Sequence, residues 1–407
     1  MTTNVQRVLS INGGSSSIKF AVYHLRAVPT RVLCGKVDRV GLRGTTLTFD
    51  DVERGQQDRH LIGDLDHGQA VTLLIDWLVQ HIDLASITAV GHRVLTGGAK
   101  YFEPQRVTEE LLDALRGMTV YAPDHLPAEI ALIERLRERM PGLLQVVCFD
   151  TAFHRNLPRV AKMLAIPRRF QTHGVERYGF HGLSYAYLME ELGRCVGAEA
   201  ANGRVILAHI GNGVSLAAVQ GGQCVDTSMG FSPASGVPMA TRSGDLDPGL
   251  VWYLQHTEHL TATQFQHMAN HESGLLGVSE TSGDVRDLLR CEANDIRAAE
   301  ALALFCYQIR KCIGALVAAL GGLDTLVFAG GIGENAPVIR ARICDALGFL
   351  GIHLDARRNT NNEAVVSSDA SRVCVRVTPT DEELMIAKAT IQIIACTHSV
   401  QEYEPNG

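Results

Sequence analysis

Residues 8–23 read VLSINGGSSSIKFAVY, in which two apolar runs flank a short glycine- and serine-rich stretch. Runs of this kind around a glycine turn predict two strands joined as a hairpin. The same pattern returns at residues 205–219, VILAHIGNGVSLAAV, with Gly211-Asn212-Gly213 as the turn. The two hairpins lie roughly 200 residues apart, a period too long for a solenoid. Because each hairpin heads one half of the chain, we predict a duplicated two-domain architecture.

Strand and helix patterns alternate along the rest of the chain. Amphipathic helices are predicted over 69–81, 109–116 and 128–140. An apolar strand over 143–149 ends on Asp150, and another over 325–329 runs into the glycine loop GGIGEN at 330–335, which precedes a helix. Units of strand, glycine loop and helix are typical of α/β domains. The fold class is therefore predicted to be α/β.

The length of 407 residues favours two domains over one. We expect a first domain over 1–150 and a second over 151–383, with the boundary near Asp150. A last helix at about 384–396 is expected to pack back on the first domain. The polar stretch at 357–369, RRNTNNEAVVSSD, is predicted to be an exposed loop.

Composition excludes several classes of protein. With 46% hydrophobic and 20% charged residues the chain can bury a normal core, and its net charge of -7 disfavours nucleic acid and membrane partners. The ten cysteines show no C-x-x-C pair, which indicates reduced thiols. No signal peptide is recognisable at the N-terminus, and the apolar stretch 301–320 contains Arg310 and Lys311, as expected of a core helix. A cytoplasmic location is predicted.

Three glycine-rich turns could hold phosphate groups. The loop at 12–17 offers backbone N–H and hydroxyl donors without bulky side chains, and Lys19 follows it. An ordinary hairpin turn explains this loop equally well, and the same holds for the Asn-Gly turn at 211–213. The loop at 330–335 matches neither a P-loop nor a dinucleotide fingerprint, but it precedes a helix N-terminus, which favours negative charge.

Four side chains have the chemistry that phosphoryl transfer to an anion needs. Arg93 follows an apolar strand and Arg242 lies in the polar turn TRSGDLDP at 241–248. Cations are needed there because both the moving phosphoryl group and a carboxylate acceptor are negative. Asp150 ends a predicted strand, and His181 lies between two glycines. Each residue alone also fits a structural role: a surface arginine, a turn cap or a structural histidine.

Eight motifs in order resemble the acetate kinase family along nearly the whole chain. They are 12-NGGSSSIK-19, 91-GHRV-94, 148-CFDTAFH-154, 177-RYGFHG-182, 209-HIGNG-213, 239-MATRSGDLDP-248, 330-GGIGEN-335 and 380-TDEEL-384. The resemblance implies the duplicated two-domain fold shared by actin, sugar kinases and Hsp70, which is a ribonuclease H-like fold. It also implies a homodimer, with ATP as co-substrate and Mg²⁺ as the metal, for which Mn²⁺ is the alternative.

The resemblance assigns roles to individual residues. It implies that Asp150, His181, Arg242 and Arg93 are catalytic, and that Asn12 and Glu382 are the metal-associated side chains. The residues implied to contact the carboxylate substrate are Lys19, Arg93, Leu95, Asp124, Phe180 and Pro233. The residues implied to line the nucleotide, in the second half, are His209, Ile210, Gly211, Asn212, Gly213, Asp284, Val285, Arg286, Gly330, Gly331, Ile332, Gly333 and Glu334.

The chain departs from the family where the acyl pocket is shaped. The family usually has GHRVVHGG where this chain has 91-GHRVLTGG-98, which introduces Leu95 and Thr96. The family's LAPLHNP is 121-YAPDHLP-127 here, so that Asp124 replaces a leucine, and Tyr185 replaces a histidine. A carboxylate beside the pocket suits a more polar acid than acetate. Acetate is the expected acceptor, and propionate or another short acid is the alternative.

Two other functions share this fold. A nucleotide-driven scaffold would need the phosphate loops but would not need Arg93, His181 and Arg242. A sugar kinase would need a carboxylate base for a neutral hydroxyl, and Asp150 could serve. A carboxylate acceptor needs no such base, because its pKa near 4 to 5 leaves it ionised at neutral pH.

Overall fold

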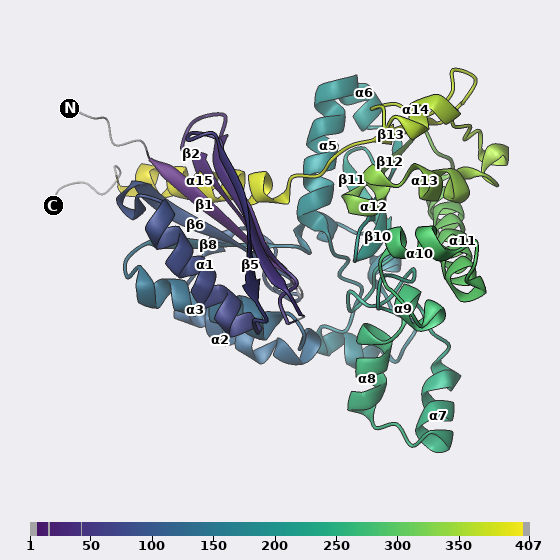
Figure 1. The fold of residues 1–407 in the computed structure, drawn as a ribbon, viewed down its shortest axis with the longest axis horizontal. Coiled ribbons are helices and arrows are strands. Elements are labelled where there is room, and N and C mark those ends of the chain that lie inside the picture. Colours follow the sequence, from purple (N-terminus) through teal and green to yellow (C-terminus); the bar gives the residue numbers. More distant parts are fainter. Residues whose placement is uncertain (1–5, 15–16, 42, 402–407) are drawn as a thin grey trace. The chain divides into compact units, whose positions relative to one another are not determined.

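The computed structural model describes residues 6–14, 17–41 and 43–401 (Figure 1). The chain divides into two compact units, which are described separately. Unit 1 comprises Met1–Ala152 and Asp381–Gly407, and unit 2 comprises Phe153–Thr380. The last helix of the chain therefore belongs to the unit that contains the N-terminus.

Unit 1 is built on an eight-stranded sheet in the order β5-β4-β3-β2-β1-β6-β8-β7. Its strands are β1 Arg7–Gly13, β2 Ser17–His24, β3 Thr30–Asp38, β4 Thr45–Asp51, β5 Gln56–Gly63, β6 Ile87–Val94, β7 Gln105–Arg106 and β8 Leu144–Phe149. The strands β1 and β2 form an antiparallel hairpin, and β6 and β8 continue parallel to β1. The carboxyl ends of β1, β6 and β8 thus meet at one edge of the sheet.

Helices cover both faces of this sheet. They are α1 His67–His81, α2 Glu109–Gly117, α3 Leu126–Arg139 and α15 Glu382–Gln401. Alternate residues of β1 point to opposite faces: Leu9 and Ile11 pack in the core with α1 and α3, while Val8 packs with Ala387 of α15. Asp66 starts α1 through a capping box with Gln69, which satisfies two free N–H groups.

Unit 2 contains a five-stranded sheet in the order β11-β10-β9-β12-β13. Its strands are β9 Arg204–Ile210, β10 Val214–Gln220, β11 Gln223–Thr227, β12 Thr325–Ala329 and β13 Cys374–Val377. The hairpin β9-β10 is antiparallel, and β12 runs parallel to β9. The arrangement of β1, β2 and β6 in unit 1 is thus repeated by β9, β10 and β12.

The helices of unit 2 are mostly short. They are α4 Arg159–Lys162, α5 Gly182–Val196, α6 Ala198–Ala201, α7 Pro248–Thr257, α8 Ala262–His271, α9 Gly274–Ser279, α10 Val285–Cys291, α11 Ile296–Leu320, α12 Gly330–Asn335, α13 Pro337–Cys344 and α14 Ala356–Thr360. Leu188 and Leu192 of α5 share a core with Leu207 of β9. The long helix α11 packs on β9, β10 and β11. It is apolar and long enough to cross a membrane, but 44% of its most apolar window is buried, as in a core helix.

The structure confirms both predicted hairpins and the α/β class. The three predicted helices in unit 1 match α1, α2 and α3 within two residues at each end. Two loop predictions were wrong. The stretch 330–335 is helical from its first glycine, as α12, and the stretch 357–369 contains most of α14 and the buried Val366. Ser15 and Ser16 of the predicted phosphate loop lie outside the described residues.

A buried arginine holds α12, α13 and α14 together. The guanidinium of Arg340, which is 0% exposed, donates to the carbonyl oxygens of Gly333 and Glu334 at 2.8 and 3.0 Å. It also donates to Asn359 Oδ1 and O and to Asn362 Oδ1, at 2.6 to 2.8 Å. Burial lowers the pKa of Arg340 to about 10.

Replacing Arg340 should destabilise unit 2, because Arg340→Ala would leave several buried acceptors without a donor. We expect a loss of about 3 kcal/mol or more in the free energy of unfolding, measured by urea denaturation. The control is Arg342→Ala, which removes a partly exposed ion pair with Glu292 and should cost less than about 1 kcal/mol. Equal losses in the two variants would contradict this role of Arg340.

Candidate active site

Arg93 lies near the end of β6 between two buried carboxylates of unit 1. Its Nη2 donates to Asp150 Oδ2 at 3.0 Å, and its Nη1 donates to Glu129 Oε1 at 3.2 Å and to the carbonyl oxygen of Gly13 at 3.1 Å. The exposed fractions of the three charged side chains are 11% for Arg93, 4% for Glu129 and 1% for Asp150. The carboxyl ends of β1, β6 and β8 and the first turns of α3 therefore converge on one guanidinium.

The charges of this cluster depend on one another. Burial opposes the charge of Arg93, but Asp150, Glu129 and Glu382 outweigh it and hold the pKa of the guanidinium above its ordinary value. Burial raises the pKa of Glu129 to about 7, against the opposing effects of Arg93 and the Leu95 N–H. The charge of Asp150 also acts upward on the pKa of Glu129. Arg93 is thus a fixed cation, while Glu129 titrates near neutral pH.

Asn12, at the end of β1, is brought to the start of α15. Its Nδ2 donates to Glu382 Oε2 at 2.7 Å and to Glu383 Oε1 at 3.0 Å. Burial raises the pKa of Glu383, while the nearby charge of Lys19 acts in the opposite direction. Lys19 stands directly opposite Asn12 in the β1-β2 ladder and is exposed. The two residues expected at the metal are therefore neighbours, with Glu383 as an additional carboxylate.

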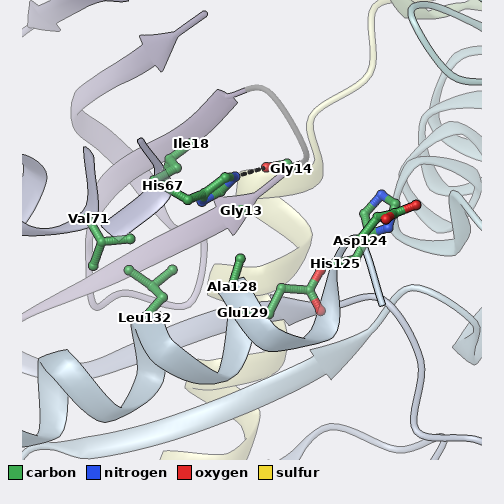
Figure 2. Close-up of a pocket in the computed structure, with 10 residues that line it drawn as sticks. All are labelled: Gly13, Gly14, Ile18, His67, Val71, Asp124, His125, Ala128, Glu129 and Leu132. Carbon is green, nitrogen blue, oxygen red and sulfur yellow. Dashed lines mark hydrogen bonds between the residues drawn. The ribbon is translucent and has the colours of Figure 1, made fainter. Parts of the chain in front are cut away.

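A narrow pocket of about 10 Å³, large enough for about one water molecule, opens beside Glu129. Figure 2 shows Glu129 on the first turn of α3, with Asp124 and His125 just before that helix. His67 Nε2 forms a hydrogen bond with the carbonyl oxygen of Gly14 on another wall of the pocket. Asp124 thus shares a pocket with Glu129.

In unit 2, His181 and Arg242 meet beside the turn of the second hairpin. A Cβ atom added to Gly213 would lie 3.2 Å from His181 Nε2 and 3.5 Å from Arg242 Nη1. Arg242 Nη1 donates to the carbonyl oxygen of Pro233 at 3.1 Å. The absence of a side chain at Gly213 therefore leaves room for a donor and a cation on the same side of the turn.

His181 is held by its backbone and by its neighbours. It has a φ of +57° directly before α5, a conformation that non-glycine residues rarely adopt. Its Nδ1 hydrogen-bonds to Ser215 Oγ at 2.8 Å, and Tyr185 OH hydrogen-bonds to the same hydroxyl. The imidazole also stacks on that of His209, with ring centroids 4.2 Å apart. These contacts orient the Nε2 edge of His181 towards Gly213.

The segments expected to line the nucleotide surround the same turn. Ala240 N donates to the carbonyl oxygen of Asn212, and a Cβ atom on Gly283 would lie 2.8 Å from the carbonyl oxygen of Ala240. Gly330 has a φ of +75° and lies so close to Ile210 that a Cβ atom there would be 2.8 Å from its carbonyl oxygen. These contacts bring 210–213, the segment before Val285, and 330–334 into one part of unit 2.

Two of the expected nucleotide residues have structural roles at helix starts. Asp284 caps α10 by accepting from Arg286 N at 2.8 Å, and it also pairs with the Arg286 guanidinium. Glu334 Oε1 accepts from Gly330 N at 2.9 Å and so stabilises the single turn of α12. Gly331, Ile332 and Gly333 lie within that turn.

The residues expected at the acyl group differ in their surroundings. Leu95 is buried in unit 1, and its N–H donates to Glu129 Oε2 at 2.9 Å. Thr96 Oγ1 accepts from Gly98 N, which shows that this departure stabilises a local turn. Phe180 is buried in unit 2, and its carbonyl oxygen contacts His154 Nε2 at 2.9 Å.

Several residues of these clusters were not predicted from the sequence, among them Glu383 beside Asn12. Glu129 is one polar position on an amphipathic helix, and Ser184 and Ser215 are small residues within a helix and a strand. Ser184 Oγ contacts His209 Nδ1 at 2.9 Å, as Ser215 does for His181. Of Glu129 and the two serines, only Glu129 could have been singled out from the sequence, because it lies in the first turn of a predicted helix that directly follows the departure at 121–127.

Two α/β units with repeated hairpin-headed sheets, and with Arg93 and Arg242 held beside glycine turns, form the arrangement expected of a phosphotransferase. Residues 7–388 match the model of a protein family that is described as the acetokinase family. The chain is 42% identical over 386 residues to an acetate kinase of Rhodopseudomonas palustris (strain TIE-1), covering 94% of this chain and 96% of that protein. It is also 42% identical over 393 residues to a propionate kinase of Citrobacter rodentium (strain ICC168), covering 95% and 96%.

A solved structure of a propionate kinase from Francisella tularensis subsp. tularensis SCHU S4 superposes with a TM-score of 0.87 at 33% identity, covering 94% of this chain and 98% of that one. The chain belongs to the acetokinase family, whose members are short-chain carboxylate kinases that use ATP. The resemblance found in the motifs and the fold class that it implied are both confirmed.

The space at Gly213 provides a test of the unit 2 cluster. Gly213→Ala should lower kcat about tenfold, because the new methyl group would lie only 3.2 Å from His181 Nε2 and would shift the imidazole from its position. The melting temperature should stay nearly unchanged, since the backbone at Gly213 does not need a positive φ. Gly193→Ala in α5, where the added methyl group meets only an ordinary contact at 3.9 Å, is the matched control. Equal kcat values for both variants would contradict the argument.

Proposed function

We propose that this chain is an acetate kinase. In this reaction acetate attacks the γ-phosphoryl group of ATP directly and in line, giving acetyl phosphate and ADP, and the transfer is reversible. The observation that carries the proposal is Arg93, a buried and permanently charged guanidinium fixed by Asp150 at the edge of the unit 1 sheet. A small carboxylate is the kind of ligand that such a planar donor pairs with.

Each cluster has a place in the proposed mechanism. The acceptor carboxylate is already a nucleophile at neutral pH, so Arg93 needs only to bind and orient it. Arg242 and His181 would meet the charge that develops on the moving phosphoryl group. Residues 209–213, 284–286 and 330–334 would line the nucleotide, and Lys19 and Pro233 would contribute to the substrate site.

Asp150 is proposed to orient Arg93 and not to act as a base. Its carboxylate is engaged with the guanidinium at 3.0 Å inside the protein, which supports this role. A sugar kinase would need the same carboxylate free to accept a proton from a hydroxyl group. The ion pair therefore favours a carboxylate acceptor over a sugar.

Asn12 and Glu382 are proposed to hold Mg²⁺ together with the nucleotide phosphates. Amide and carboxylate oxygens suit Mg²⁺, and Mn²⁺ accepts the same ligands. Among the residues that the structure describes, no group of three or more His, Cys, Asp or Glu side chains could hold a metal alone. A donor set of one amide and one carboxylate fits an ion that needs substrate phosphates, and such an ion would neutralise phosphate charge.

The acid and the assembly are further parts of the proposal. Leu95 replaces the valine that is usual in the family, and at the acyl group its extra methylene would leave less space for a longer chain, which favours acetate over propionate in this proposal. Propionate is the alternative, because relatives of equal identity bear either name. A homodimer in the cytoplasm is proposed from the family resemblance.

A hydroxamate assay tests the activity. Purified protein with Mg-ATP, hydroxylamine and acetate should form acetyl hydroxamate, and a panel of C2 to C4 acids should show acetate to be preferred. Arg93→Ala and Arg242→Ala should each lower kcat by about 10² or more, because each removes a charge that stabilises the transition state. Arg194→Ala, which removes an exposed pair with Glu191, is the control and should keep full turnover. No product from any acid would refute the proposal.

Shortening Leu95 tests the basis of acid selection. Leu95→Val should raise the ratio of kcat/KM for propionate to that for acetate by about tenfold or more, as expected for one methylene in an apolar pocket. The Leu95 backbone bond to Glu129 does not involve its side chain and is retained. An unchanged ratio would show that Leu95 does not limit the acyl chain.

A further inference from the structure

Glu129 is a buried carboxylate that the proposed reaction does not use. Its two oxygens have different partners: Oε1 accepts from Arg93 Nη1 at 3.2 Å, and Oε2 accepts from Leu95 N at 2.9 Å. A protonated Oε1 cannot accept from Arg93 in the same way, whereas Oε2 can keep the Leu95 N–H. Adding a proton at Oε1 therefore frees one N–H of Arg93 Nη1, while the bonds of the guanidinium to the Gly13 carbonyl oxygen and to Asp150 are kept.

Charge balance shows why such a release is needed. With Glu129 and Asp150 both ionised, Arg93 faces two buried negative charges before any substrate arrives. A substrate carboxylate would bring a third negative charge to the same guanidinium. When Glu129 takes up one proton, only two ionised carboxylates, those of Asp150 and the substrate, remain around Arg93. Repulsion between the negative charges of the substrate and Glu129 favours this protonation.

We propose that Glu129 takes up a proton when the acceptor carboxylate binds to Arg93, so that Glu129 is a positioning residue that makes substrate binding dependent on pH. This inference rests on the function proposed above. Asp150 keeps its ion pair at the opposite end of the guanidinium throughout. Substrate affinity should then fall as pH rises above neutrality.

The raised pKa of Glu129 agrees with proton uptake by this carboxylate near neutral pH. Burial raises this pKa to about 7, and the carboxylate of a substrate bound at Arg93 would raise it further. The groups that face Glu129 are Arg93 from β6, Asp150 after β8, Asp124 and His125 before α3, and His67 of α1, while Glu382 of α15 acts on Arg93. Imidazoles titrate in the same pH range, so a histidine control is required.

The first experiment is the KM for acetate at saturating Mg-ATP between about pH 6 and pH 8.5. Acetate stays ionised over this range, so a single proton uptake with a pKa near 7 predicts a rise in KM of about 30-fold. Glu129→Gln, which mimics the protonated side chain, should keep a low KM that varies less than about twofold. His125→Gln, from the same pocket, should retain the rise. An equal rise in Glu129→Gln would overturn the inference.

A second measurement does not depend on turnover or on the folding of a variant. The heat of acetate binding to the wild-type protein at about pH 8, compared between buffers of different ionisation enthalpy, reports the number of protons taken up. We expect about 0.9 proton for each acetate bound, and equal heats in all buffers would overturn the inference. Failure to bind or phosphorylate any short acid would instead refute the proposed function. Turnover with a pH-independent KM would refute only the role of Glu129.

Discussion

The pairing of Arg93 with buried carboxylates is the interaction on which the unit 1 site depends. A guanidinium that is 11% exposed loses most of its hydration, and only anionic partners at close range make its burial tolerable. Asp150 and Glu129 lie 57 and 36 residues from Arg93 in the sequence. Their contacts therefore join β6 to the end of β8 and to α3, and the bond to the Gly13 carbonyl adds the end of β1.

Unit 2 also contains a buried arginine, but this one is stabilised by neutral partners. Arg340 is surrounded by carbonyl and amide oxygens, and burial lowers its pKa to about 10. The carboxylates around Arg93, in contrast, raise the pKa of Arg93. Arg340 therefore suits a structural role, while Arg93 suits the binding of an anion. The glycines in unit 2 act by close approach: Gly330 at Ile210 and Gly213 at His181 keep the turns free of side chains where donors gather.

Local patterns in the sequence predicted most of the fold. The hairpins β1-β2 and β9-β10 follow from apolar runs around glycine turns, and α1, α2 and α3 follow from helical periodicity. The loop at 330–335 could not be assigned correctly, because Glu334 and the distant Arg340 stabilise a helical turn that its glycines disfavour. The family resemblance, and no local pattern, implied that Asn12 and Glu382 are both associated with the metal. Glu129 was missed because its burial and partners arise only from tertiary packing.

Among the three departures from the family motifs in unit 1, Leu95 and Asp124 become related once Glu129 is included. Thr96 caps a local turn and needs no other explanation. The other two residues meet at one carboxylate: the Leu95 N–H binds Glu129 Oε2, and Asp124 lines the narrow pocket beside it (Figure 2). The carboxylate whose charge acts upward on the pKa of Glu129 is Asp150, which shares Arg93 with it. A departure beside Arg93 and a departure in the pocket wall thus lie at the same titratable group, Glu129.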